Sequence, residues 1–498
     1  MEPVKPSERG QNQKMEEKSE LRKLAEFIHD LTWEALPEEV QKTVPLRVLD
    51  LVSVAAGAVH DPLVEQAKEA FSYLYGENLW NRKEPEHGEK KEKPGCAHIW
   101  GQSGTYPPAM AAMVNAMLAH TLELDDVHTA SKTHGSASLI PAAWACAESL
   151  GRSGKEFLLA VVCGYETVNR VGMAFGVSSH RNRGWHATAT CGVFGCAAAC
   201  AKLLDLSVDQ IISALGMAGT QSSGVWAFLG DGCNCKVLHT ARAAADGMEA
   251  AFLAKNGMTG PEHIFDARDG GLLTAMSDGG DILKISAGLG EVYEILNMDM
   301  KPYPCCRSAH CAIDAALEIR KSLLEGEKGN AQKQKILEKL ADQIKKIQIE
   351  TYLVGYKQCA VSDGCLNPKT TLDAKFSTPY SAAVALLYGK VTMQEFEPQV
   401  VADQTVQKLL HKVEVMPVEH FTAQYPKHWG CSMKMTMQDG TVYEAEITDP
   451  SGSVARPLTK EQAVGKAEVF FREICPGEEK KLVDEMLKLE EKGVLPRI

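Results

Sequence analysis

The chain has 498 residues, of which 45% are hydrophobic and 24% charged, and these proportions are typical of a soluble globular protein with two or more domains. Its formal net charge of −12 argues against a nucleic-acid partner. No apolar run is long enough to cross a membrane, and the polar N-terminus has no signal-peptide core. Fifteen scattered cysteines indicate reduced thiols rather than a disulfide framework, so we expect a cytoplasmic protein.

The first 296 residues are dominated by helical patterns. Residues 1–18 are polar and charged and are predicted to be disordered. Apolar residues recur at helical spacing from Leu21, a second helix begins near Val44, and residues 76–95 indicate a charged surface loop. Segments rich in Ala and Gly, which allow helices to pack closely, follow at 137–151, 157–176, 187–204, 208–224 and 240–257. These features predict a packed helical domain.

An acidic cluster follows a predicted helix over residues 107–121. A helix C-terminus carries partial negative charge, so it repels carboxylates. Even so, three acids and two histidines come soon after this helix: Glu123, Asp125, Asp126, His128 and His134. The grouping favours a site for charge and proton transfer, although a solvated junction between helix and loop explains the spacing equally well. The short loop before His134 lets its imidazole fold back over Asp125, and we expect the carboxylates to raise its pKa.

The pattern changes near Leu296. Alternating β-branched residues predict strands at 345–354 and 412–416, and residues 434–447 predict a hairpin that turns at Asp439-Gly440. Helices are expected at 311–325, at 374–388 and again from Thr459, with an exposed loop at 326–335.

The predicted fold class is therefore mostly α with an α+β second domain. We assign residues 19–296 and 456–498 to a large discontinuous helical domain. Residues 297–455 are assigned to an α+β lid domain that is inserted before the last helices.

Further residues that suit catalysis or binding lie outside the acidic cluster. His186 precedes an Ala-rich helix whose N–H groups can hold a carboxylate, although packing beside Trp185 explains it more simply. Lys236 also directly precedes a helix, and Lys301 lies near Arg307 in a segment with two prolines. Such cations suit a polyanionic substrate, whereas each lysine taken alone is more typical of a protein surface.

Motifs for metals and organic cofactors are absent from the sequence. It contains no CxxC pair, no dinucleotide-binding glycine motif after a strand, no Walker A motif and no GxSxG nucleophile elbow. The remaining candidates for catalysis are acids, histidines and lysines. That set favours proton abstraction next to a carboxylate without a metal or cofactor.

Taken together, these segments resemble the MmgE/PrpD family, which includes 2-methylcitrate dehydratase, cis-aconitate decarboxylase and iminodisuccinate epimerase. The similar segments occur in order along most of the chain, among them VLDLVSVAAGA (48–58), MLAHTLELDDVH (117–128), HGSASLIPAAWACAE (134–148), GWHATATCGVFGCAAACAKLLDL (184–206), CKVLHTARAAADGMEAAFLA (235–254), KPYPCCRSAH (301–310) and DAKFSTPYSAAVAL (373–386). The resemblance implies a helical domain with an α+β lid, a homodimer, and catalysis without metal or organic cofactor.

The resemblance also implies site residues. It matches the acidic cluster, the two histidines and the two lysines to the family's active site. We predict four catalytic residues: His134, Asp125, Glu123 and His186. We predict four substrate-binding residues: Lys236, Lys301, Asp126 and Arg307. The resemblance also implies one catalytic tyrosine, and the sequence leaves Tyr352 and Tyr356 as alternatives for it.

The resemblance implies a lyase or isomerase that acts on a small di- or tricarboxylate, and the first hypothesis is dehydration as in 2-methylcitrate dehydratase. Decarboxylation of a cis-aconitate-like acid, epimerisation at an α carbon, and a carboxylate-binding scaffold without activity are the alternatives. Glu123 and Cys306 stand where the animal decarboxylases have Asp and His, and both differences weaken an animal-type decarboxylase.

Overall fold

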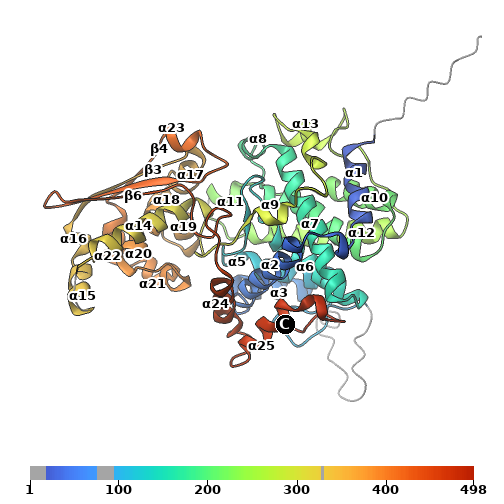
Figure 1. Cartoon of the computed structure of the whole chain (residues 1–498), viewed down its shortest axis with the longest axis horizontal. Coiled ribbons are helices and arrows are strands. Elements are labelled where there is room, and N and C mark those ends of the chain that lie inside the picture. Colours follow the sequence, from blue (N-terminus) through green and yellow to red (C-terminus); the bar gives the residue numbers. More distant parts are fainter. Residues whose placement is uncertain (1–17, 76–94, 231, 327–329) are drawn as a thin grey trace, which may run out of the picture.

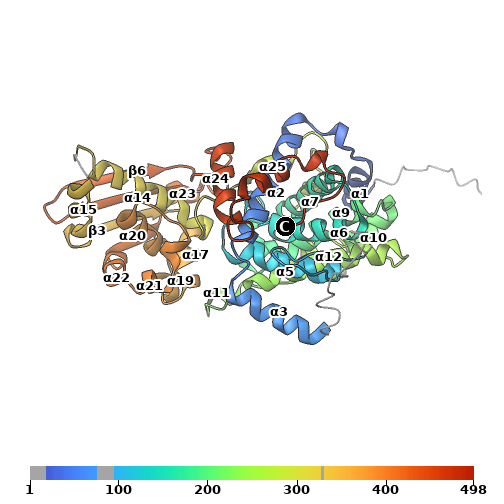
Figure 2. The ribbon, with the colours of Figure 1, turned by 90° about the horizontal axis from the view of Figure 1, so that it is seen from below.

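The computed structural model describes residues 18–75, 95–230, 232–326 and 330–498 (Figure 1). The predicted disordered tail and the charged loop at 76–95 lie outside the described residues, apart from Lys18 and Gly95. The chain forms a helical half and a smaller α+β half, which lie side by side along the longest axis (Figures 1 and 2). This arrangement confirms the predicted fold class.

The helical half contains most of the helices. Those before residue 300 are α1 (Glu20–Asp30), α2 (Glu38–Ala56), α3 (Pro62–Tyr75), α5 (Pro108–Thr121), α6 (Ser136–Leu150), α7 (Gly154–Phe175), α8 (Val177–Asn182), α9 (Ala187–Leu203), α10 (Val208–Thr220), α11 (Ala227–Gly230), α12 (Lys236–Lys255) and α13 (Leu272–Met276). The chain returns at its end with α24 (Lys460–Phe471) and α25 (Glu479–Leu487). Figure 2 shows this last pair of helices beside α2.

Small residues allow the central helices to approach closely. A Cβ atom on Gly247 of α12 would lie 2.5 Å from both Cys196 Cβ and the carbonyl oxygen of Val193 on α9. Any larger residue at this position would therefore push the two helices apart. This is the physical reason for the Ala- and Gly-rich composition noted in the sequence.

The α+β half is built on a four-stranded sheet in the order β4-β3-β5-β6. Its strands are β3 (Ile344–Thr351), β4 (Val413–Pro417), β5 (Cys431–Met437) and β6 (Val442–Ile447). β4 is parallel to β3, whereas β5 and β6 are antiparallel to their neighbours. The predicted strands and the hairpin are confirmed.

Helices pack on this sheet and fill the rest of the α+β half. They are α14 (His310–Leu323), α15 (Asn330–Glu338), α16 (Leu340–Gln343), α17 (Leu353–Cys359), α18 (Asp363–Leu366), α19 (Thr371–Lys375), α20 (Thr378–Tyr388), α21 (Pro398–Val401), α22 (Gln404–Leu410) and α23 (Glu419–Thr422). The expected loop at 326–335 is wrong in part, because α15 begins at Asn330. Its Ala, Gln, Lys and Leu residues have high helix propensity, and this preference outweighs the polar character of the segment as a whole.

A small second sheet connects the acidic cluster to the α+β half. β1 (Val127–His128) pairs in antiparallel fashion with β2 (Met298–Asp299). The segment after β2 carries Lys301 and Arg307. The pairing therefore brings two distant parts of the sequence together beside the acidic cluster.

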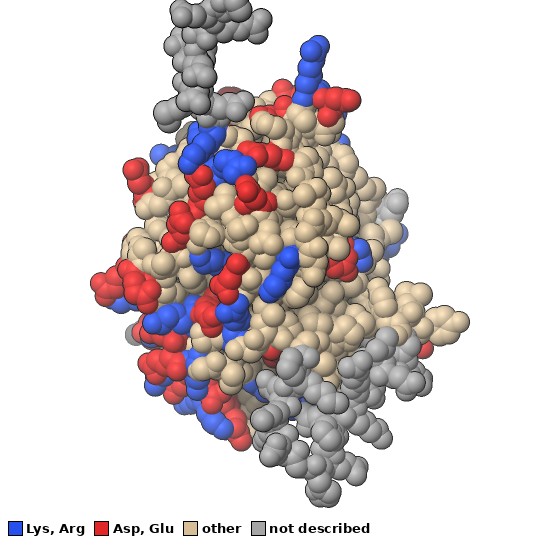
Figure 3. All heavy atoms as spheres, turned by 90° about the vertical axis from the view of Figure 1, so that its right-hand side faces the viewer, with Lys and Arg blue, Asp and Glu red and all other residues tan. Residues whose placement is uncertain are grey.

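Each half has its own hydrophobic core. One core joins residues between Leu21 and Met298 with residues between Ala467 and Leu489, and the other joins residues between Cys305 and Ile447. No helix in the described part of the chain is long and apolar enough to cross a membrane. On the face of the helical half shown in Figure 3, basic and acidic side chains are interspersed.

Candidate active site

Two lysines from distant parts of the chain reduce the electrostatic repulsion between the C-terminal end of helix α5 and the acids that follow it. Lys375 Nζ donates a hydrogen bond to the carbonyl oxygen of Leu122 at 3.1 Å, and Lys466 Nζ donates one to that of Leu124 at 3.1 Å. Lys375 therefore binds the carbonyl group of the C-cap residue of α5, where its charge offsets the partial negative charge of the helix end, and Lys466 binds a carbonyl group two residues further on. The backbone at Glu123 has a φ of 57°, which turns the chain sharply into the acidic cluster.

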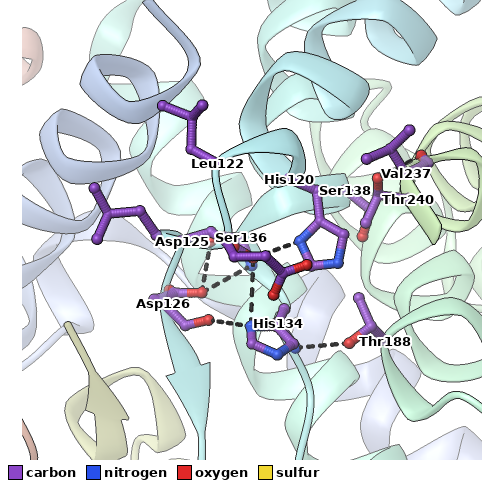
Figure 4. A network of polar contacts seen from close by, with 12 residues as sticks. His120, Leu122, Asp125, Asp126, His134, Ser136, Ser138, Thr188, Val237 and Thr240 are labelled. Atoms are coloured by element: carbon purple, nitrogen blue, oxygen red, sulfur yellow. Dashed lines mark hydrogen bonds and ion pairs between the residues drawn. The ribbon is translucent and has the colours of Figure 1, made fainter. Parts of the chain in front are cut away.

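Asp125 lies at the centre of the cluster and is fully buried. His120 Nδ1 lies 2.8 Å from its Oδ2, and His134 Nδ1 lies 3.4 Å from the same oxygen (Figure 4). Lys301 Nζ lies 3.9 Å from Oδ1. Burial alone would raise the pKa of Asp125, but His120, Lys301 and His134 outweigh it and hold that pKa well below its usual range. Asp125 is therefore an ionised carboxylate, and its negative charge is compensated by the groups around it.

His134 is positioned through its backbone and its ring. Its N–H donates to Thr188 Oγ1 at 3.0 Å, and its Nδ1 lies 2.8 Å from the carbonyl oxygen of Asp126 (Figure 4). A carbonyl oxygen can only accept, so Nδ1 carries the proton and Nε2 of the neutral ring carries the lone pair. This ring can accept a proton at Nε2.

The predicted rise in the pKa of His134 is wrong. Burial lowers this pKa to about 4, and the positive charge of Lys301 adds to that effect. Asp125 acts in the opposite direction but is shared with His120 and Lys301. The imidazole is therefore neutral at pH 7.

Glu123 is paired with both predicted lysines. Its carboxylate accepts a hydrogen bond from Lys236, and its backbone carbonyl accepts one from Lys301 Nζ at 3.0 Å. Burial opposes ionisation, but Lys236, His120 and Lys301 hold the pKa of Glu123 at about 2. The two lysines are therefore already part of a buried network of charges with Glu123 and Asp125.

His186 stands at the start of α9, as predicted, and it contacts a second histidine. Its Nδ1 lies 2.8 Å from His239 Nδ1, so one of the two rings donates to the other. Its ring packs edge-on against Trp226 with the centroids 4.8 Å apart. Burial first, and then the charge of Lys236, hold the pKa of His186 well below its usual value.

A small pocket that is partly open to solvent lies where these groups meet the α+β half. Its lining from the helical half includes Glu123, Lys132, His134, His186, Trp226 and Lys236. Its lining from the α+β half includes Cys306, Arg307, Ser308, Gln358, Phe376 and Trp429. Small-molecule sites commonly occur at such junctions, so this pocket is the candidate active site.

Not every predicted site residue lines the pocket. Lys301 and Asp125 lie directly behind it, where both are fully buried. Asp126 also lies outside the lining, because its carboxylate accepts hydrogen bonds from Ser136 at 2.5 Å and Tyr165 at 2.7 Å. The Asp126 side chain is therefore occupied within the helical core, and substrate binding by Asp126 stays a prediction that these contacts do not favour. Its role is to hold His134 through its backbone carbonyl.

Two further predicted residues lie on the α+β side. Arg307 lines the pocket, but its guanidinium is held by Asp299 Oδ2, which accepts from Nη2 at 2.8 Å and from Nε at 3.1 Å. Of the two tyrosines, Tyr352 is fully buried and donates to Ser308 Oγ at 2.9 Å. Because Ser308 lines the pocket, Tyr352 is the tyrosine that supports its wall.

Several functional residues were not predicted. His120 holds Asp125, and it precedes the acidic cluster in the last turn of α5, so its spacing could have revealed it. His239 lies one helical turn into α12 after Lys236. Lys132 and Lys375 had no sequence signal, because only the tertiary structure buries them. Among the described residues, no group of three or more His, Cys, Asp or Glu side chains is arranged to hold a metal ion.

Comparison with known protein families decides the family. The model of the MmgE/PrpD N-terminal domain matches residues 22–283, and that of the MmgE/PrpD C-terminal domain matches residues 303–490. This chain belongs to the MmgE/PrpD family.

Named relatives in this family are lyases. The cis-aconitate decarboxylase-like protein oryM of Aspergillus oryzae is 28% identical over 446 residues, which cover 86% of this chain and 86% of that protein. The cis-aconitate decarboxylase of Mus musculus is 29% identical over 377 residues, or 74% of this chain and 73% of that protein. The mitochondrial 2-methylcitrate dehydratase of Yarrowia lipolytica is 24% identical over 258 residues, or 50% of this chain and 46% of that protein.

Proposed function

We propose that this MmgE/PrpD protein is a lyase that removes water from a small di- or tricarboxylate, as its 2-methylcitrate dehydratase relative is named for doing. The observation that carries the proposal is the neutral His134 in the pocket lining. Its Nδ1 is held by the Asp126 carbonyl, which leaves Nε2 as a base for a proton on the carbon next to a carboxylate.

The surrounding charges suit the negative charge that develops in this step. When the C–H bond breaks, its electron pair spreads onto the adjacent carboxylate. Lys236 in the pocket lining and Lys301 behind it would stabilise that charge. Glu123 holds both lysines in place through hydrogen bonds.

The second half of the reaction uses the proton that His134 has gained. The C–O bond to the β-hydroxyl breaks, the C=C bond forms, and the imidazolium returns the proton to the leaving hydroxide as water. Asp125 would stabilise this transient imidazolium, because it lies 3.4 Å from the ring. One histidine can therefore serve first as base and then as acid.

Decarboxylation of a cis-aconitate-like tricarboxylate is the second candidate. The length of the alignment favours it, since the decarboxylase-like relative from Aspergillus oryzae matches 86% of both chains. In that reaction a C–C bond breaks and CO₂ leaves, so an acid must protonate the carbon. The low pKa of His134 suits a base better than an acid, so we place dehydration first.

A substrate panel in deuterated buffer, followed by NMR, tests the proposal. The panel contains 2-methylcitrate, citrate, cis-aconitate and an α-amino or imino dicarboxylate. Dehydration gives a new alkene from a hydroxy acid and supports the proposal. Alkene formation with loss of CO₂ supports the second candidate. Exchange of the α proton with an intact skeleton shows an epimerase, and binding without turnover shows a carboxylate-binding scaffold.

We also propose that the protein is a cytoplasmic homodimer. The family resemblance supports the dimer, and the fifteen free cysteines support a reducing compartment. Light scattering on the eluting protein measures the oligomer directly, and a monomeric mass at working concentration would contradict the proposal.

A further inference from the structure

Lys132 is a half-buried lysine with a buried Nζ, and the mechanism above does not use it. It lies in the loop between β1 and α6, in a left-handed backbone conformation with a φ of 57°. Its side chain lines the pocket, yet its buried Nζ has no hydrogen-bond partner among the described residues. A left-handed backbone is unfavourable for a lysine, so the fold holds this side chain in place against a local cost.

The other cations that line the pocket are already paired. Lys236 donates to Glu123, and Arg307 binds Asp299 through two nitrogens. Lys132 therefore differs from both, because no carboxylate of the described protein neutralises it. Burial lowers the pKa of Lys132 to about 8, with the nearby Cys306 acting in the opposite direction, so the ammonium keeps its charge at pH 7.

An unpaired buried ammonium is costly, and an anionic ligand would remove that cost. The lining offers a carboxylate two further polar groups, Ser308 and Gln358 from the α+β half, together with aromatic side chains such as Phe376 and Trp429. In the proposed reaction, the carboxylate next to the reacting carbon faces Lys236, which is another cation of the lining. A second site for negative charge is therefore present at Lys132.

We propose that Lys132 binds a substrate carboxylate other than the one beside the reacting carbon, and that it thereby makes the enzyme prefer tricarboxylates to dicarboxylates. This inference rests on the proposed function for the identity of the substrate class. The selection itself is a property of binding, so it can be measured without turnover.

Two unreactive ligands that differ by one carboxylate provide the test. Tricarballylate is propane-1,2,3-tricarboxylate, and glutarate has the same chain without the central carboxylate. Isothermal titration calorimetry at pH 7 should show wild-type protein binding tricarballylate at least tenfold more tightly than glutarate. That ratio follows from a charge-assisted hydrogen bond, which changes affinity by roughly 10- to 100-fold.

Lys132→Met and Lys132→Gln should both reduce this ratio to about threefold or less, chiefly by weakening tricarballylate. Lys155→Met serves as the matched control, because Lys155 is a half-exposed lysine that pairs with Glu34 on the surface. It should leave the ratio unchanged.

A second readout keeps the inference testable if one variant folds poorly. Since Met removes an unpaired buried charge, Lys132→Met should raise the melting temperature of the ligand-free protein, and saturating tricarballylate should stabilise it less than it stabilises wild type. An unchanged ratio in both Lys132 variants would overturn the inference. Absence of turnover on every polycarboxylate would instead overturn the proposed function and leave the binding ratio as a separate result.

Discussion

His134 Nδ1 lies 3.4 Å from Asp125 Oδ2, yet the two groups do not form a simple ion pair. His120 lies closer to the same oxygen, at 2.8 Å, and Lys301 approaches the other oxygen. The charge of Asp125 is therefore shared, and it does not suffice to keep a proton on a buried imidazole. The arrangement holds a neutral base next to a carboxylate that can stabilise its protonated form once it has accepted a proton.

Replacement of His134 tests the proton transfer. His134→Gln keeps the size of the side chain and some hydrogen bonding but removes the titrating nitrogen. We expect kcat to fall about 10²–10⁴-fold, the usual contribution of general acid–base catalysis. Circular dichroism and the melting curve should remain close to wild type. Near-normal turnover would show that His134 only positions the substrate, and His186 would become the preferred base.

The pH dependence follows from the same residue. The pKa of His134 is about 4, so Nε2 stays unprotonated down to about pH 5. We expect kcat/KM, which reports on the free enzyme, to show no loss attributable to this histidine between pH 8 and pH 5. An acid limb near pH 6.5 that disappears in His134→Gln would contradict this.

Stability should also depend on pH, with a sign set by the lowered pKa. An unfolded histidine titrates near its ordinary value of about 6.5, so between pH 6.5 and pH 4 the unfolded chain binds more protons than the folded one. The contribution of His134 to the free energy of unfolding is therefore present above pH 6.5 and is lost as the pH falls toward 4. Urea unfolding at several pH values should show a shallower decline in His134→Gln than in wild type.

The lysines that contact Glu123 are expected to serve both catalysis and stability, and mutation can separate these two roles. Lys236→Met should lower kcat/KM at least tenfold, because a charge-assisted hydrogen bond contributes about 1.5–3 kcal/mol. It should also destabilise the protein, since it leaves Glu123 buried with less compensation. The double variant Lys236→Met/Glu123→Gln should recover stability but not activity. Wild-type kinetics in both Lys236→Met and Lys301→Met would remove these lysines from the site.

Lys375 is expected to stabilise the end of α5. Its Nζ binds the Leu122 carbonyl at 3.1 Å in a buried position, and Met at this position would leave that carbonyl unpaired. Lys375→Met should lower the melting temperature by several degrees, whereas Lys369→Met on the exposed start of the same segment should not. Equal melting temperatures for the two variants would show that the helix end is held by other contacts.

Removal of metals tests the expectation of a cofactor-free reaction. The sequence has none of the usual iron–sulfur or zinc spacings, so activity should survive exhaustive dialysis against a chelator. Turnover is measured before and after dialysis. Loss of activity that iron or zinc restores would overturn this mechanism.

Much of the architecture could be predicted because it depends on local patterns. The helix before Glu123, the strands near Ile347 and Val413, and the hairpin at Asp439-Gly440 were all correct, since periodicity and turn residues are properties of neighbouring positions. The domain boundaries at 296/297 and 455/456 stay predictions, and so does any motion of the α+β domain as a lid. The loop expected at 326–335 was wrong from Asn330 on, because polarity is weaker evidence than helix propensity.

The sequence by itself determined the family, the fold class and the residue types of the site, since ordered motifs and periodic patterns carry that information. The tertiary structure alone decided what those residues do. Burial and the charge of Lys301 reverse the expected pKa shift of His134, and Ser136 and Tyr165 occupy Asp126. A loop buries the Nζ of Lys132 without a hydrogen-bond partner among the described residues. Charge and proton affinity depend on solvent exclusion and on groups brought from distant parts of the chain, and neither is contained in local sequence.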